Sequence, residues 1–245
     1  MGMNACKTPD AQGFVPMPDG ALIRWRRFGR EGPAVALLHG NEEDYRCFAR
    51  MVGPLSRRFS VVAVDSRGHG ESTRGQGVTL GRMSDDLARV LAALGVERTH
   101  LVGFSDGANV ALHFALDHPE QLGRLVLMGG NLCPAGVKFL SQLPCEVGAW
   151  LCRRLAPVSA QARRNGEILE LMTKEPSFTP EQLGAIRAPT LVLAGDRDMI
   201  RPEHTALIAA SIPKAQLFTL PNCSHFLLRD QPELTNRLVL RFLEG

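Results

Sequence analysis

Short runs of valine and leucine recur along the chain and alternate with longer segments in which apolar residues follow a helical spacing. The apolar runs lie at residues 35–38, 60–64, 100–104, 124–128, 190–194 and 216–220. The helical segments lie at residues 45–57, 80–94, 108–117, 203–211 and 232–243. Wholly apolar strands that alternate with helices are typical of a parallel sheet with helices on both faces.

Two more strands are predicted ahead of this series. Phe14–Met17 and Ala21–Phe28 flank Pro18-Asp19-Gly20, a turn sequence, so we expect an antiparallel hairpin. The expected fold class is therefore α/β, with a mostly parallel sheet of about eight strands and helices on both faces.

One interval, residues 131–188, breaks the alternation of strands and helices. Its length of about sixty residues exceeds what a crossover between neighbouring strands needs. Helices within it are expected to be interrupted by prolines, namely Pro144, Pro157 and Pro176. The segment either adds to the core or forms a short helical lid over the carboxyl ends of the strands, where open parallel sheets bind ligands. In the second case Phe139 and Trp150 are candidate substrate contacts.

Composition and charge exclude some classes of protein. The 245 residues suffice for a single globular domain, and 44% apolar with 22% charged residues is ordinary for a folded chain. The net charge of +3 comes from scattered residues without a block of like charges, so no nucleic-acid partner is expected.

Neither targeting nor metal binding has a sequence signal. The N-terminal residues lack the apolar stretch of a signal peptide, and no apolar run is long enough to span a bilayer. We therefore expect a cytoplasmic protein with no membrane partner. No metal is expected either, because the cysteines lack the spacings of zinc or redox motifs. They are predicted to be free, mostly buried thiols: Cys6, Cys47, Cys133, Cys145, Cys152 and Cys223.

The most informative short motif is Gly103-Phe104-Ser105-Asp106-Gly107, which fits the pattern G-x-S-x-G. It lies between a predicted strand and a predicted helix, the context in which this pattern forms a tight turn that exposes a nucleophilic serine. The glycines keep Cβ atoms out of the turn, and the main-chain amide of Asp106 is placed to face a developing oxyanion. We therefore interpret Ser105 as a candidate nucleophile.

A serine hydroxyl needs a general base, and the base needs an acid that orients it. Of the seven histidines, His225 is the best candidate base, because it lies in the loop after the last predicted strand. Asp196 and Asp198 follow the apolar run 190–194, so either carboxylate would meet Ser105 and His225 over one edge of the sheet.

Five motifs, taken in order, resemble those of the α/β-hydrolase family over nearly the whole chain. They are LLHGN at 37–41, DSRGHGES at 65–72, GFSDG at 103–107, GDRDMIRP at 195–202 and CSHF at 223–226. The resemblance implies that the acid is Asp198, three residues after the glycine that ends its strand. It also implies an oxyanion hole formed by the main-chain amides of Asn41 and Asp106, and it assigns no catalytic role to residues 65–72.

Two features near the predicted site bear on the substrate. His39-Gly40-Asn41-Glu42 differs from the H-G-G-G of many lipases and esterases, which argues against long triglycerides. Acidic residues also cluster there, at Asp106 and at 42–44. They either hold an amine of the substrate, as in some similar hydrolases, or are stabilised by a helix dipole without any ligand. His39 and Glu42 are further candidate substrate contacts.

Together these observations predict a serine hydrolase that needs no cofactor, specifically a carboxylesterase that cleaves small or medium acyl esters. One alternative keeps the same scaffold and hydrolyses a carbon–carbon bond or a lactone. Another, from a different class, is a catalytically weak ligand receptor whose lid binds a partner protein, because fold does not determine function.

Overall fold

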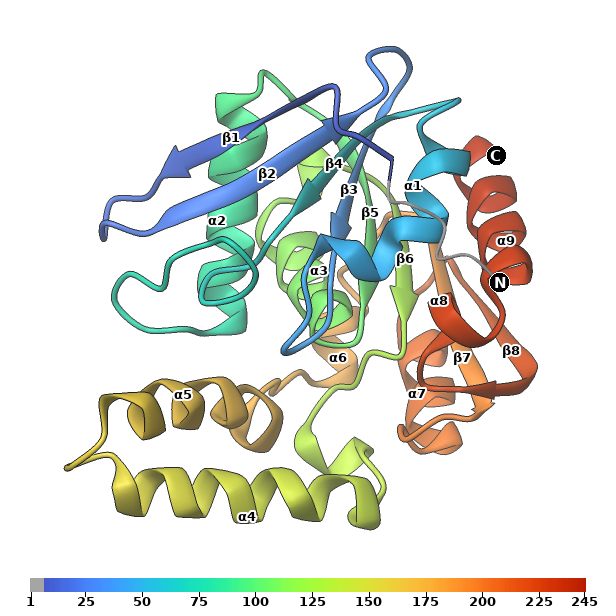
Figure 1. Ribbon diagram of the computed structural model, residues 1–245. Helices are drawn as coiled ribbons and strands as arrows, with labels where there is room; N and C mark the ends of the chain where they lie inside the picture. Colours follow the sequence, from blue (N-terminus) through green and yellow to red (C-terminus); the bar gives the residue numbers. More distant parts are fainter. Residues whose placement is uncertain (1–6) are drawn as a thin grey trace, which may run out of the picture.

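A computed structural model describes residues 7–245 of the chain, so Cys6 lies outside the described residues. Its centre is an eight-stranded sheet in the order β1-β2-β4-β3-β5-β6-β7-β8 (Figure 1). The first two strands form the predicted hairpin, β2 pairs antiparallel with β4, and all later pairs are parallel. The strands are β1 (Ala11–Pro16), β2 (Leu22–Phe28), β3 (Ala34–Leu38), β4 (Ser60–Val64), β5 (Thr99–Phe104), β6 (Leu122–Met128), β7 (Thr190–Arg197) and β8 (Ala215–Ser224).

The central parallel strands β3 and β4 are apolar along almost their whole length because helices cover both faces of the sheet, whereas the edge strand β8 is mostly exposed. In β3, Val35 and Leu37 belong to one core cluster, whereas Ala36 and Leu38 belong to the other. One face carries α1 (Ala49–Leu55), α8 (Leu227–Asp230) and α9 (Pro232–Glu244). The opposite face carries α2 (Leu80–Ala93), α3 (Asp106–Asp117), α6 (Pro180–Leu183) and α7 (Pro202–Ser211). The predicted α/β fold class is therefore confirmed.

Short 3₁₀ turns lie between some of these elements. η1 (Tyr45–Phe48) precedes α1, so the segment predicted as one helix consists of a 3₁₀ turn and a short α-helix. Two others, η2 (Pro119–Gln121) and η3 (Pro134–Gly136), follow α3 and β6.

Between β6 and β7 the chain leaves the sheet and forms two long helices, α4 (Phe139–Leu155) and α5 (Ala160–Lys174). They lie side by side beyond the carboxyl edge of the strands, with α5 nearer the sheet and α4 outermost (Figure 1). The excursion is closed at its base, where the amide of Phe178 donates to the carbonyl of Leu132 at 2.8 Å.

One expectation about this excursion is corrected by the structure. α4 continues through Pro144, which lies inside the helix rather than at its end. The missing N–H removes one hydrogen bond near the N-terminal end of a long helix, and the remaining turns are unaffected. Of the two alternatives for the segment, core packing applies to Ile168 and Leu171 of α5, whereas most large apolar residues of α4 face solvent.

Candidate active site

Ser105 lies in a strained turn between β5 and α3. Its φ of 54° and ψ of −122° are unfavourable for a residue with a side chain, so the surrounding structure must hold the turn. A Cβ on Gly103 would lie 2.3 Å from the carbonyl oxygen of Gly107, and one on Gly107 would lie 2.0 Å from that of Leu38. Glycine is therefore required on both sides of Ser105.

Three of the predicted site residues are joined by hydrogen bonds. The Ser105 hydroxyl lies 3.0 Å from His225 Nε2, and His225 Nδ1 lies 2.7 Å from Asp198 Oδ1. Asp198 follows β7 and His225 follows β8, so adjacent parallel strands bring both residues to the edge where β5 ends. His225 and Asp198 are both nearly buried, at 5% and 3% exposed.

The second aspartate of this loop has a different environment. Asp196 accepts hydrogen bonds from the main-chain amides of Asn222 and Cys223, at 2.9 and 3.0 Å. These bonds lower the pKa of its carboxyl and tie the end of β7 to β8. Asp196 thus fixes the loop, whereas Asp198 contacts the histidine.

Two residues that the sequence had not singled out shape the space around His225. Phe104, next to the serine, places its ring centroid 5.1 Å from that of His225. A Cβ on Gly129 would lie 2.7 Å from His225 Cε1, so only glycine leaves room for the imidazole. The sequence signal was the Gly129-Gly130 pair directly after a predicted strand, a place where backbone often approaches another group closely.

The main-chain amides of Asn41 and Asp106 flank this edge. Among residues 7–245, neither amide donates to a protein acceptor. Asp106 begins α3, so its amide is one of the free donors at a helix N-terminus. Two free amides beside the serine match the donor pair that stabilises a tetrahedral oxyanion.

The side chain of Asn41 joins the loop after β3 to α5. Its Nδ2 donates to the carbonyl of Ile168 at 3.1 Å, and its Oδ1 accepts from the amide of Glu42 at 2.9 Å. His69 Nε2 lies 2.9 Å from the same Oδ1. Glu42 has a φ of 57°, a conformation that this side-chain bond helps to hold.

His39 is placed differently from what a substrate contact requires. Its ring is 2% exposed, Nδ1 donates to the carbonyl of Gly40 at 2.7 Å, and Nε2 accepts from the amide of Ser66 at 2.9 Å. Burial lowers the pKa of His39 to about 4, so the ring stays neutral. Both nitrogens are used inside the protein, so the ring stabilises the loop and is not available to a substrate.

The acidic residues near Ser105 are not equivalent. Glu42 is exposed, whereas the half-buried Glu43 accepts from the amide of Gly40 at 3.2 Å, and burial raises its pKa. Asp106 is 8% exposed; one oxygen accepts from Asn109 at 3.3 Å, and Oδ2 has no partner among the described residues. Burial raises the pKa of Asp106 to about 6. Glu43 and Asp106, rather than the exposed Glu42, are therefore the acidic residues that burial affects near the site.

The two aromatic residues predicted to contact substrate lie on α4. Phe139 is 64% exposed and Trp150 is 54% exposed, and the Arg154 guanidinium lies 5.4 Å from the Trp150 ring centroid. Within residues 7–245 no ring stacking or cation–π contact joins either ring to a residue around Ser105. Their exposure places them toward solvent, apart from the buried Asp198 and His225.

The motif at 65–72 has structural contacts. Asp65 accepts from Arg26 at 3.0 Å and from the amide of Tyr45 at 3.1 Å. Arg67 and Asp86 form a buried ion pair, with Nε and Oδ2 2.6 Å apart. These bonds hold the loop that carries His69, next to Asn41.

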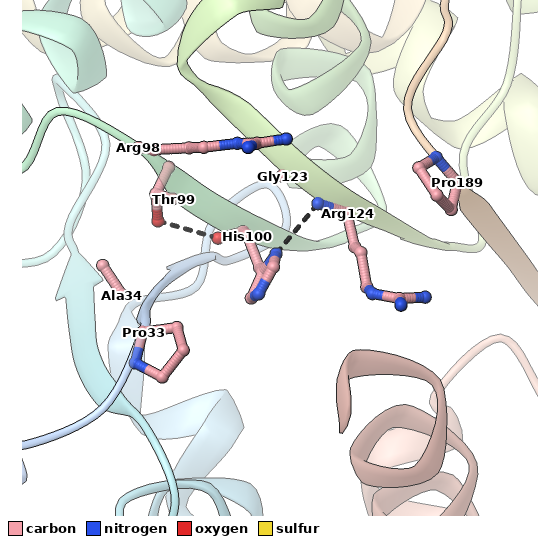
Figure 2. A pocket seen from close by; sticks show the side chains of 8 residues that line it. All are labelled: Pro33, Ala34, Arg98, Thr99, His100, Gly123, Arg124 and Pro189. Carbon is pink, nitrogen blue, oxygen red and sulfur yellow. Dashed lines mark hydrogen bonds between the residues drawn. The ribbon is translucent and has the colours of Figure 1, made fainter. Parts of the chain in front are cut away.

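The structure also has a hollow that lies away from Ser105, His225 and Asp198. This hollow of about 420 Å³ opens at the opposite edge of the sheet, lined by Arg98, His100 and Arg124 among others (Figure 2). In that hollow His100 Nδ1 accepts from the amide of Arg124 at 2.9 Å.

No group of three or more His, Cys, Asp or Glu side chains within residues 7–245 is arranged to hold a metal ion.

Comparison with known proteins gives consistent relatives. A family model described as alpha/beta hydrolase fold matches residues 33–144. A 2-hydroxy-6-oxononadienedioate/2-hydroxy-6-oxononatrienedioate hydrolase from Cupriavidus pinatubonensis is 31% identical over 274 aligned positions, covering 94% of this chain and 94% of the relative. A 2-hydroxy-6-oxo-6-phenylhexa-2,4-dienoate hydrolase from Burkholderia cepacia is 29% identical, covering 87% of this chain and 88% of the relative.

A solved structure agrees with these sequence relatives. The crystal structure of a hydrolase from Pseudomonas aeruginosa PA01 superposes with a TM-score of 0.80 at 28% identity, covering 96% of this chain and 99% of that one. The sheet order, the turn at Ser105 and these relatives lead to one conclusion: the chain belongs to the α/β-hydrolase family.

Proposed function

We propose that the chain is a serine hydrolase in which Ser105 is the nucleophile, His225 the general base and Asp198 the acid that orients His225. The observation that carries this proposal is the unbroken hydrogen-bond series from the Ser105 hydroxyl through His225 to Asp198. A serine flanked by an oriented base is the arrangement that activates a hydroxyl at neutral pH.

The proposed reaction has two halves. Ser105 attacks a substrate carbonyl while His225 Nε2 takes the hydroxyl proton, and the amides of Asn41 and Asp106 stabilise the oxyanion. The oxyanion collapses, the leaving group takes the proton from His225, and an acyl group stays on Ser105. Water, activated by His225, then releases the acid and restores the serine. These steps require no cofactor.

For the substrate we propose a 2-hydroxy-6-oxo dienoate, whose carbon–carbon bond next to the 6-oxo carbon is hydrolysed. The relatives named above act on compounds of this class, and they align along nearly the whole chain. The carboxylesterase activity predicted from the motifs has less support from these relatives. An ester is therefore included in the test as a comparison substrate.

The charge at the site favours one substrate of this class over another. Asp106 follows the nucleophile in the chain and has a buried carboxylate oxygen without a partner among the described residues, and Glu43 adds a second carboxylate that accepts from the amide of Gly40. A buried carboxylate repels a second carboxylate on the substrate because little water screens the two charges. We therefore expect the mono-acid 2-hydroxy-6-oxo-6-phenylhexa-2,4-dienoate to be cleaved in preference to the di-acid 2-hydroxy-6-oxononadienedioate.

We also propose that residues 131–188 form the lid of a single domain spanning residues 1–245. α5 contacts the site loop through Asn41 and Ile168, and Lys138 at the start of α4 donates to the carbonyl of Asp198. The two helices are thus attached both to the loop that carries an oxyanion donor and to the loop that carries the acid. A cover in this position excludes water and shapes the pocket.

The test uses the purified chain and Ser105→Ala with four substrates: the two dienoates, an N-acyl homoserine lactone and p-nitrophenyl butyrate. Intact mass is measured after treatment with a fluorophosphonate. We expect a single adduct and hydrolysis for the wild type alone, with the highest kcat/KM for the phenyl dienoate. If p-nitrophenyl butyrate has the highest kcat/KM, the carboxylesterase prediction is favoured instead. If the folded wild type gives neither adduct nor turnover, the alternative of a catalytically weak ligand receptor is favoured.

A further inference from the structure

α4 exposes a continuous apolar face to solvent. At about 100° per residue, its large apolar side chains fall on one side of the helix. This outer face consists of Phe139, Leu140, Leu143, Val147, Trp150, Leu151 and Leu155, with Val158 just beyond the helix, and each is between 39% and 84% exposed. Within this band of α4 the charged side chain is that of Arg154.

The opposite side of α4 carries small or polar residues, and it is this side that packs on α5. Gln142 Nε2 donates to the carbonyl of Met172 at 2.8 Å, and Cys145 Sγ lies 4.0 Å from Met172 Sδ. A Cβ on Gly148 would lie 3.1 Å from Leu169 Cδ1. The helix is therefore bound to the protein by its less apolar side, and the outer face remains unpartnered in one chain.

The outer face is larger than the apolar patches that soluble monomers usually expose. Taking side chains of the areas typical for aromatic and aliphatic residues, the exposed parts add up to on the order of 800 Å². The largest patch of a typical monomer measures roughly 300–600 Å², and it is often functional. Figure 1 shows α4 as the outermost element on this side, so no helix or strand within residues 7–245 stands between it and an approaching flat surface.

The charges around the outer face are mostly positive. The turn between α4 and α5 is flanked by Arg153, Arg154, Arg163 and Arg164. Within residues 7–245 none of these four cations has a carboxylate partner. Lys138, just before the helix, donates to the carbonyl of Asp198 and does not belong to the outer face. Glu146 is the acid of α4, while Glu167 and Glu170 of α5 are paired with Arg74 and Lys174.

This charge distribution decides between the possible occupants. A second copy packed antiparallel on α4 would set the arginines of one chain against the Phe139–Leu140 end of the other, which has no acid to pair with them. A parallel pair would set arginine against arginine, which repels. Neither arrangement neutralises the arginines. An anionic lipid surface complements both properties, because aromatic and aliphatic side chains enter the boundary of the acyl chains while arginines meet the phosphates.

We propose that the outer face of α4 binds the surface of an anionic phospholipid membrane. The contact is peripheral: none of the helices within residues 7–245 has both the length and the apolarity to cross a bilayer. This proposal differs from the expectation of no membrane partner, which was based only on the lack of membrane-spanning runs and of a signal-peptide pattern. The proposal does not depend on which reaction occurs at Ser105.

The experiment is vesicle co-sedimentation of the whole chain, with phosphatidylcholine alone and with phosphatidylcholine containing phosphatidylglycerol. The wild type is expected to bind the anionic vesicles, and added salt is expected to weaken the binding. The double variant Leu140→Asp/Leu151→Asp should lower binding at least about tenfold, because it places charge in the middle of the face. The matched control Leu207→Asp/Leu217→Asp changes two leucines that are 41% and 42% exposed elsewhere, and it should bind normally.

A second pair separates charge from hydrophobicity. Arg153→Gln/Arg154→Gln should reduce the preference for anionic vesicles about tenfold. Circular dichroism checks that each variant is folded, and these arginines are exposed, so their replacement keeps the test valid even if an aspartate variant unfolds.

Two results would overturn the proposal. One is wild-type protein that stays in the supernatant with anionic vesicles, or that sediments equally well after the leucine substitutions. The other is a dimer, detected by light scattering in the absence of lipid, that dissociates on Leu140→Asp. That result would assign the face to a second copy of the chain.

Discussion

Helices α2 and α4 are both amphipathic, and they turn their apolar faces in opposite directions. α2 buries Leu80, Leu87 and Leu91 completely against the sheet and exposes charged residues. α4 packs on α5 through its small residues and exposes its leucines and aromatic rings. The periodicity of a helix therefore predicts that it has an apolar face. Whether that face is buried depends on which side of the helix packs against the rest of the protein.

The contrast extends to the regions that the helices belong to. Around the sheet, buried polar groups such as His225, His39 and Arg67 have partners within the protein. In α4 the large apolar side chains point outward, whereas Ile168 and Leu171 of α5 are buried in the core. The first region has the properties of a rigid site, and the second those of a surface that meets something else.

The largest expected effect tests the interior of the first region. Asp198→Asn should lower kcat/KM roughly 10⁴-fold, because an amide cannot hold His225 in the productive tautomer. The matched variant is Asp196→Asn, which changes a carboxylate two residues away that contacts only amides, and it should stay within about tenfold of the wild type. Steady-state kinetics on the preferred substrate measures both. Equal losses of kcat/KM in the two variants would mean that the conformation of the loop after β7, rather than the Asp198 carboxylate, is needed for activity.

The next effect tests the comparison of the two helices directly. Leu87→Ala in α2 should lower the free energy of unfolding by about 2–5 kcal/mol, because the side chain is fully buried. Leu140→Ala in α4, at 82% exposure, should change it by less than about 0.5 kcal/mol. Urea unfolding followed by circular dichroism gives both values. A large loss from Leu140→Ala would show that the outer face is covered in solution.

A smaller effect concerns the unpaired carboxylate beside the nucleophile. The pKa of Asp106 is raised to about 6 in the fold, mainly by burial, from 3.8. Its proton-linked stabilisation is therefore complete below the lower value and lost as the pH rises through the higher one. Asp106→Asn should raise the free energy of unfolding by on the order of 1–3 kcal/mol at about pH 8, and the gain should vanish near pH 4.

The same variant has a second readout. Removing the negative charge should improve kcat/KM for the di-acid dienoate relative to the phenyl mono-acid. A stability gain that persists unchanged at low pH would contradict the assignment of the effect to the Asp106 charge.

The smallest effect tests the link between the two regions. Asn41→Ala removes the bond to Ile168 and the support of Glu42, so the oxyanion amide should be held less firmly, with kcat lowered about tenfold. Arg74→Gln is the matched control, because Arg74 binds Glu167 and the carbonyl of Arg164 on the same helix without touching the loop. An equal fall in kcat for both variants would mean that attachment of α5, not the position of the amide, is limiting.

Much of the fold could be predicted from the sequence because its parallel strands are buried on both faces. The runs at 60–64 and 100–104 coincide with β4 and nearly with β5, since valine-rich segments of this length have few alternatives. Ser105, His225 and the pair Asp196 and Asp198 were predicted by the same logic, because strand ends at one sheet edge must lie together. The choice of Asp198 and of the amide of Asn41 came from the family resemblance.

What could not be predicted depends on contacts between distant segments. The need for Gly129 arises only once His225 has been placed against it. Glu43 rather than Glu42 turns toward the site because Glu42 has a positive φ, a property of the folded loop. His39 looked available in a glycine turn, and its two nitrogens found partners in Gly40 and Ser66 only in three dimensions.

The hydrogen bond between Phe178 and Leu132 brings the two ends of the excursion together. The entropy of closing such a segment grows slowly with its length, so a replacement of another length can bring its ends to the same place at little cost. It must also replace the contacts that Ile168 and Lys138 make with Asn41 and Asp198. The proposed substrate range and the proposed surface attachment therefore belong to one segment that can be inherited or engineered as a unit, while the strands before Ser105, Asp198 and His225 stay as they are.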